Sequence, residues 1–244
     1  IISRNKYQKK RFVYLPKKKN MLKNKNNFDE KFVKEFNGVL IKSKESLYSI
    51  DENKKTLTIN QNKNSDWFLI LNANLAGWKL IFNGIKNNEL ESDGVQRFNK
   101  YGLTGCLNIY NSYLDETSIL ANNGSCEDSI NIISSRGNLN EIAINNSFAD
   151  AIDFDFSNIK IQKIFVNKAG NDCIDLSAGN YELNEANLKN CNDKAISVGE
   201  KSNLNLNNVL IDKSFIGISS KDLSLTKINK AKISNTKLCA EAKQ

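Results

Sequence analysis

The feature that most constrains the fold of this chain is an internal repeat of 22 residues. Six times, a small residue precedes an aliphatic residue, which is followed by a small polar residue. The central aliphatics lie 23, 22, 22, 22 and 22 residues apart, at Leu107, Ile130, Ile152, Ile174, Ile196 and Ile218. A period of this length is typical of a solenoid, in which each copy buries its apolar face by stacking on its neighbours.

Each copy of the repeat contains two stretches in which apolar and polar residues alternate. Between Leu139 and Phe156, Ile142 and Ile144 form the first stretch and Ile152 with Phe154 begins the second. Alternation at period two is typical of half-buried strands, and no copy contains a ten-residue stretch with helical periodicity. The pattern therefore predicts an all-β chain, folded as a parallel β-helix with about 22 residues per coil.

A leucine-rich-repeat horseshoe is the alternative architecture, because it has a similar period. The segment from Leu139 through Ile142 and Ile144 to Ser147 matches its L-x-x-L-x-L-x-x-N pattern passably. However, a horseshoe has one strand per repeat. The alternating stretch from Ile152 to Phe156 would then be an unexplained second strand.

Three segments of the repeat resemble the coils of known β-helical proteins. Asp150–Ser157, Gly170–Ser177 and Asp193–Glu200 are similar to coils of right-handed parallel β-helix proteins in the pectate-lyase-like superfamily, and the likeness spans about residues 80–244. More weakly, they resemble β-helix modules attached to bacterial surface or spore-coat-type kinase-like proteins. The resemblance implies a single-stranded right-handed β-helix. Members of the superfamily are mostly lyases, hydrolases and epimerases of acidic polysaccharides, with tailspikes and adhesins beside them, and fold alone does not decide among these.

Charge is distributed unevenly along the chain. Residues 1–36 contain 12 Lys and Arg against 3 Asp and Glu, which leaves 23 basic and 24 acidic residues, of the chain's 35 and 27, in the remainder. The nearly neutral remainder does not favour a nucleic-acid groove. The basic segment is interpreted as a solvated linker or as a segment that binds anionic lipid or polysaccharide. It lacks the apolar core of a secretory signal, and no stretch is long and apolar enough to predict a transmembrane segment.

Three regions are predicted along the chain. Residues 1–37 form a basic lead-in with one short helix around Phe28–Phe36. Residues 38–84 form an irregular first coil that caps the solenoid, with strands at 39–41, 47–50, 56–59, 67–71 and 78–82. Residues 85–244 form the regular β-helix. Another coil begins near Ala240, so we expect a fragment of a longer protein that is truncated at the C-terminus.

Aromatic residues and cysteines each allow a specific expectation. We expect Trp67 and Trp78 to cover the open end of the core, and an aromatic binding platform is the alternative. Cys106, Cys173 and Cys239 share one column of the repeat but lie on non-adjacent coils, too far apart for a bridge. We therefore expect the five cysteines to be free thiols that pack as small hydrophobes. The absence of His and of C-x-x-C argues against a zinc site.

Stacking converts the repeat into vertical columns of side chains about 4.8 Å apart. One column is predicted to stack the carboxylates of Asp128, Asp150 and Asp172, and another to stack Asp153 against Asp175. Oxygen ligands of this kind suit Ca²⁺, so these five residues are the candidate metal ligands. The alternative is that they cap turns or lie on the solvated surface. The candidate ligand-binding residues are Asn131, Asp153, Asp155, Asp175, Ser197, Glu200 and Asp222.

Two further features bear on function. The small residues before the central aliphatics form either the floor of a groove for an extended polymer or a corner where only small side chains fit. Lys194 and Lys221 are weak candidates for a catalytic base. However, the sequence lacks the catalytic arginine motif of pectate lyases and the paired aspartates of polygalacturonases, so whether the chain is an enzyme stays open.

Together these features predict a polysaccharide-binding β-helix, exported or on the surface of a bacterial cell. Ca²⁺ would assist binding, and uronate lyase or epimerase chemistry would accompany it if the chain is catalytic. The expected partners are a polysaccharide or another cell-surface glycan and further domains of the same chain. The alternative function is a non-catalytic structural spacer or adhesin module of a larger surface protein.

Overall fold

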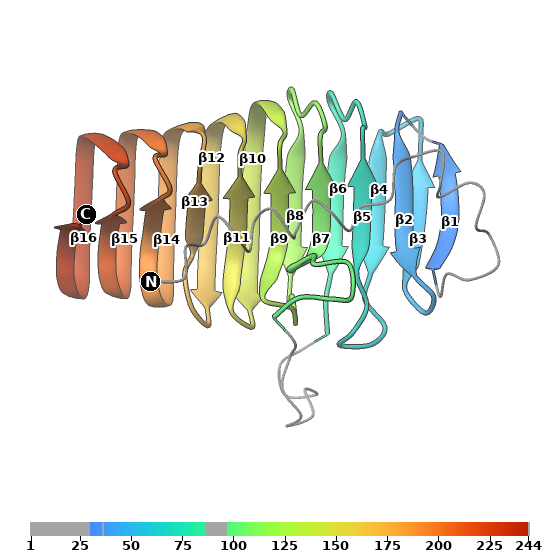
Figure 1. The fold of residues 1–244 in the computed structure, drawn as a ribbon, viewed down its shortest axis with the longest axis horizontal. Coiled ribbons are helices and arrows are strands. Elements are labelled where there is room, and N and C mark those ends of the chain that lie inside the picture. Colours follow the sequence, from blue (N-terminus) through green and yellow to red (C-terminus); the bar gives the residue numbers. More distant parts are fainter. Residues whose placement is uncertain (1–29, 36, 86–96, 244) are drawn as a thin grey trace.

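The computed structural model describes residues 30–35, 37–85 and 97–243, and the regular elements of this part of the chain are all β-strands joined by turns and short irregular segments. Its strands join in one continuous sheet that winds through about eight turns (Figure 1). The described residues therefore include no helix long and apolar enough to cross a membrane. The basic lead-in up to residue 29 lies outside the described residues.

The last three strands are the longest, with 18 or 20 residues each, because there the segments of one coil join into a single strand. The first eight are β1 (Glu30–Glu35), β2 (Val39–Ser43), β3 (Leu47–Asp51), β4 (Thr56–Asn60), β5 (Phe68–Leu71), β6 (Lys79–Asn83), β7 (Gly105–Tyr110) and β8 (Ser118–Asn122). The others are β9 (Asp128–Ile133), β10 (Arg136–Ser147), β11 (Asp150–Asp155), β12 (Asn158–Ala169), β13 (Ile174–Ser177), β14 (Asn180–Gly199), β15 (Asn203–Ser220) and β16 (Leu225–Ala242).

The coils stack in parallel along two faces of the solenoid. Face 1 consists of β2, β5, β7, β9, β11, β13 and the C-terminal segments of β14, β15 and β16. Face 2 consists of β3, β4, β6, β8, β10, β12 and the preceding segments of the same three long strands. Each coil thus has strands on both faces, which excludes a horseshoe and confirms the parallel β-helix.

The register follows the sequence repeat directly. Ile152 of β11 pairs with Ile130 of β9 and with Ile174 of β13, and all three side chains are fully buried in one core. On face 2, exposed and buried residues alternate along β12, so that Ile164 and Val166 lie inside and Phe165 lies outside. Identical positions therefore stack in continuous apolar columns, which each coil completes only through its neighbours.

Antiparallel strands close the N-terminal end. β1 pairs with β2, β2 pairs with β5, and β3 pairs with β4 across a turn between the strands predicted at 47–50 and 56–59. The expected helix around Phe28–Phe36 is wrong, because residues 30–35 form strand β1, which pairs with the edge of β2. Parallel stacking begins with β4 on β6 and β5 on β7, before the predicted start at Ile85.

The column of small residues lies inside the molecule. Ala151 and Ile152 are consecutive residues of β11, and both are fully buried in the core. A side chain on Gly217 of the same column would place its Cβ 2.4 Å from the carbonyl oxygen of Cys239. Both observations agree with a corner where only small side chains fit, and full burial argues against the exposed floor of a groove.

Four of the five cysteines form disulfides, which corrects the expectation of free thiols. Cys106 is bonded to Cys126 and Cys173 to Cys191, each with 5.4 Å between Cα atoms. Each cysteine of the small-residue column pairs with a cysteine 20 or 18 residues later, Cys126 before β9 and Cys191 within β14, where the next coil returns to the same corner. The sequence argument had excluded bridges among Cys106, Cys173 and Cys239, which share a column, but it did not consider bridges from this column to Cys126 or Cys191. Cys239 is a free, exposed thiol.

The two tryptophans take different places. Trp78 belongs to the main core. Trp67 lies in a second cluster with Leu69 and Leu71 on the outer side of face 1, where its ring meets that of Tyr101 edge-on at 5.5 Å. Both tryptophans are buried, so neither forms an exposed binding platform.

Candidate functional site

Six aspartates gather on face 1 across three successive coils, and we call them the acidic row. The strands bring the predicted columns into register, since Asp150 pairs with Asp128 and Asp153 pairs with Asp175. The row consists of Asp128, Asp150, Asp153, Asp155, Asp172 and Asp175. Strand alternation puts Asp153 and Asp155 on the outer side of the sheet, because Ile152 and Phe154 point into the core.

Burial distinguishes the acidic row from an ordinary solvated surface. Asp128, Asp155 and Asp172 are 2–3% exposed, and only Asp175 is half-buried rather than buried. Two like charges about 5 Å apart repel by about 3 kcal/mol at an effective dielectric near 20, and burial adds a desolvation cost. Protonation, hydrogen bonds or a bound cation must offset these costs.

Three aspartates of the row, Asp128, Asp153 and Asp155, surround the side chain of Asn131. Its side-chain nitrogen Nδ2 lies 3.2 Å from both Asp128 Oδ2 and Asp153 Oδ2, 3.4 Å from Asp155 Oδ2 and 2.9 Å from Thr104 Oγ1. An amide nitrogen carries two protons, so it cannot satisfy four oxygens at once. Asn131 Oδ1 is buried and accepts no hydrogen bond from the described residues. The geometry thus concentrates carboxylate oxygens around one polar side chain.

Asp150 and Asp172 make a different kind of contact, because each carboxylate accepts a backbone N–H from the following coil. Asp150 Oδ1 accepts hydrogen bonds from the backbone N–H of Asp172 at 2.8 Å and from Asn171 Nδ2 at 2.7 Å. One coil later, Asp172 Oδ1 accepts the backbone N–H of Lys194 at 2.8 Å. These two residues therefore make the turn-capping contacts that were the alternative to metal binding.

Burial and neighbouring charges shift the ionisation of this pair. Burial, with the charges of Asp128 and Asp172, raises the pKa of Asp150 to about 8. Burial also raises the pKa of Asp172 to about 6, although the adjacent Lys194 ammonium opposes the rise. Both carboxyls therefore hold their protons to a higher pH than a solvent-exposed aspartate does.

Lys194 closes the row with an ion pair. Its Nζ lies 3.4 Å from Asp172 Oδ1 and also contacts Asp193. Burial alone would lower the pKa of Lys194, but the hydrogen bond that Lys194 donates to the Asp193 carboxylate and the charge of Asp172 outweigh it, and the pKa rises. A lysine held in its charged form is poorly suited to act as a general base, which weakens its candidacy for catalysis.

The remaining predicted residues separate into two groups. Ser197 pairs with Asp175 on face 1 and is fully buried, so it extends the row by one coil. Glu200, Lys221 and Asp222 lie instead in or beside the turns that follow β14 and β15, where Lys201 N–H donates to the Asp222 carbonyl. The structure therefore brings Asn131 and Ser197 to the acidic row and leaves the other three at the adjoining turns.

Sequence reasoning missed two residues of this site. Thr104 precedes strand β7 and occupies the same position of the repeat as Asn171, three residues before the central aliphatic, but Glu127 and Ala149 stand at that position in the coils between them. Asn171 was identifiable, because it lies one position before the column of Asp128, Asp150 and Asp172. Its amide reaches back one coil to Asp150.

The described part of the chain contains no group of three or more His, Cys, Asp or Glu side chains already arranged around a single metal position. The predicted Ca²⁺ site therefore depends on a rearrangement of carboxylates or on oxygens of other kinds, such as Asn131 Oδ1. No protein-family model, curated protein or solved structure matches the chain.

Proposed function

We propose that this chain is a glycan-binding β-helix whose acidic row binds a polysaccharide with the assistance of Ca²⁺. The observation behind the proposal is the concentration of six aspartates on one face, five of them buried. Carboxylate and amide oxygens are the ligands that Ca²⁺ prefers. A divalent cation would offset the repulsion among these groups and bridge them to the hydroxyl or carboxylate oxygens of a sugar.

The long axis of the solenoid suits an extended polymer. Parallel strands repeat the same backbone geometry on face 1 from β5 to β16, so successive sugar units would meet equivalent surfaces (Figure 1). The resemblance to pectate-lyase-like coils points to the same class of ligand. Two disulfides support an exported protein, because such bonds persist mainly outside the reducing cytosol.

A structural spacer or adhesin module is the second candidate, and one observation favours it. Asp150 and Asp172 already accept backbone hydrogen bonds from the following coil. Carboxylates that cap corners contribute to stability without a ligand. In that case the acidic row would be an internal brace of the solenoid.

Calorimetric titration with Ca²⁺ separates the two functions. The test variant is the double substitution Asp153→Asn and Asp175→Asn, which keeps side-chain size and removes two charges. The matched control is Glu141→Gln with Glu185→Gln, since both glutamates are exposed on face 2. We expect saturable binding in the parent and in the control, and loss of binding by at least tenfold in the test variant.

The glycan is tested in the same material. A uronate polymer such as polygalacturonate should bind the parent more tightly with Ca²⁺ than with a chelator, and an absorbance assay for unsaturated products would detect lyase chemistry. An absence of Ca²⁺ binding, with a melting temperature unaffected by chelator, would overturn the proposal and favour the spacer.

A further inference from the structure

The two disulfides have contrasting surroundings. Cys173 and Cys191 are 0% and 2% exposed, and no described side chain donates a hydrogen bond to either sulfur. Cys106 is also fully buried, but Cys126, its partner, is partly exposed in the turn before β9. Cys106–Cys126 is therefore the more accessible of the two disulfides to a thiol in solution.

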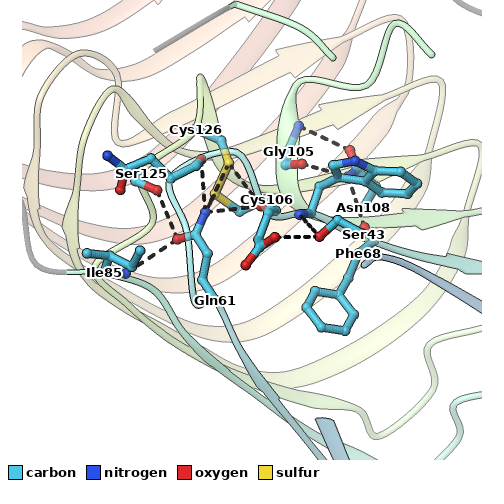
Figure 2. The surroundings of a disulfide bond; sticks show 12 residues. Ser43, Gln61, Phe68, Ile85, Gly105, Cys106, Asn108, Ser125 and Cys126 are labelled. Carbon is cyan, nitrogen blue, oxygen red and sulfur yellow. Dashed lines mark hydrogen bonds between the residues drawn. A yellow bond between two sulfur atoms is a disulfide. The ribbon is translucent and has the colours of Figure 1, made fainter. Parts of the chain in front are cut away.

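Gln61 places an amide donor beside both sulfurs of the accessible bridge. Its Nε2 lies 3.3 Å from Cys106 Sγ and 3.7 Å from Cys126 Sγ, as Figure 2 shows. Gln61 is itself buried, at 8% exposure. A buried N–H donor stabilises the negative charge that appears on a sulfur when a disulfide breaks.

The orientation of this amide is determined by its other contacts. The Asp66 carbonyl, which can only accept, lies 3.0 Å from Nε2, and the Ile85 backbone N–H, which can only donate, lies 3.4 Å from Oε1. Ser125 Oγ also donates to Oε1 at 2.9 Å. The nitrogen, not the oxygen, therefore faces the disulfide.

We propose that Cys106–Cys126 is a thiol-exchange site at which a low-molecular-weight thiol forms a mixed disulfide with Cys126. The attacking thiolate bonds to Cys126 Sγ, the bond between Cys126 and Cys106 breaks, and its electron pair leaves on Cys106 Sγ beside Gln61. A second thiol then attacks the mixed disulfide and releases Cys126 as a thiolate. Two thiols are oxidised to one small disulfide, and their two protons pass through solvent to the two protein thiolates.

The position of the site gives the exchange a structural consequence. Cys126 lies two residues before Asp128, the first member of the acidic row. Breaking the bridge releases the turn before β9 from the corner at Cys106. Thiol exchange would thereby alter the N-terminal end of the acidic row.

The test is differential alkylation of the full chain under native conditions. The protein is incubated with reduced glutathione, quenched with iodoacetamide at timed intervals, and analysed by peptide mass spectrometry. We expect glutathione on Cys126 and label on Cys106 at least ten times faster than label on Cys173 and Cys191. Cys239, which is exposed and free, labels at once and reports that the reagent is active.

Two variants test the role of Gln61. Gln61→Met removes the donor and keeps the length of the side chain, and Ser125→Ala removes a contact on the opposite side of the amide. We expect Gln61→Met to slow exchange at Cys126 by about fivefold relative to Cys173–Cys191 in the same sample, the size of one weak hydrogen bond. Ser125→Ala should change that ratio less than Gln61→Met does.

Either of two results would overturn the inference. Equal reduction rates for the two disulfides, or faster reduction of Cys173–Cys191, would show that access does not distinguish them. Faster exchange in Gln61→Met would show that the amide protects the bridge and does not assist its opening. The ratio within one sample controls for any general loss of stability, because unfolding exposes both bridges.

Discussion

At the scale of single residues, burial decides what the acidic residues of this chain do. Asp153 and Asp212 both lie on outer surfaces of strands, but Asp153 is buried in the acidic row and Asp212 lies among Asn235, Ser234 and nearby lysines. Hydrogen bonds from Asn235 and Ser234 lower the pKa of Asp212. In contrast, burial raises the pKa of Asp150 to about 8.

The raised pKa of Asp150 predicts a loss of stability as pH increases. The folded state holds the proton up to about pH 8, whereas the unfolded chain releases it near pH 3.8, so the folded state binds more protons between these values. Its contribution to the free energy of unfolding is complete below about pH 3.8 and is lost as pH rises to about 8. The negative charges of Asp128, Asp172 and Asp175 all favour the protonated form of Asp150.

Asp150→Asn is the variant that tests this linkage. The amide keeps an oxygen for the Asp172 N–H and cannot ionise, so we expect it to be more stable than the parent at pH 9. The gain is bounded by about 1.4 kcal/mol for each unit of pKa shift. Melting curves from pH 4.5 to 9 measure it, with Glu185→Gln as the exposed control. Parallel pH profiles for parent and Asp150→Asn would contradict the prediction.

At the scale of elements, alternation and period were sufficient to place the strands. The five strands expected between residues 39 and 82 appear as β2 to β6, within one or two residues of their predicted bounds. The error at residues 30–35 has a physical cause. A short amphipathic segment fits helix or strand equally well by pattern, and pairing with β2 decides the outcome.

Each disulfide joins two successive coils covalently, so we expect Cys173–Cys191 to stabilise the folded β-helix. Closing a loop of 18 residues is worth about 3 kcal/mol. The double variant Cys173→Ala with Cys191→Ala should lose about that free energy of unfolding, since alanine already fills this column at Ala151 and Ala195. Urea denaturation measures the loss.

Cys239→Ala is the matched control for this prediction. Cys239 lies in the same column but is exposed and forms no disulfide, so its replacement should change the free energy of unfolding by less than about 0.5 kcal/mol. A loss below about 1 kcal/mol in the double variant would show that coil stacking alone holds this corner.

At the scale of the whole molecule, stability is a sum over coils and the contacts between neighbours. This predicts that one complete coil is removable. Deleting residues 136–157 removes 22 residues and no cysteine. Asn158 then follows Ser135 in place of Arg136, its partner in the preceding coil, so the register of the remaining coils is kept. We expect a shorter, less stable, cooperatively folded β-helix that lacks half of the acidic row.

Deletion of only residues 136–146 is the control, because it removes half a coil and puts inward-facing residues out of register. Circular dichroism and gel filtration distinguish the two, with β-structure and a compact monomer expected only for the complete deletion. Equal folding of both variants would show that register between coils is unimportant.

The sequence by itself determined the architecture, the period and the columns, because each depends on local alternation and on a repeat that stacking brings into register. It also placed Asp128, Asp150 and Asp172 in one column and Asp153 against Asp175. Tertiary structure decided which cysteines pair, that the outward aspartates are buried, and that Thr104 and Asn171 contact them. Those outcomes depend on how the chain returns to each corner, and turn geometry in three dimensions is not encoded in a column of aligned residues.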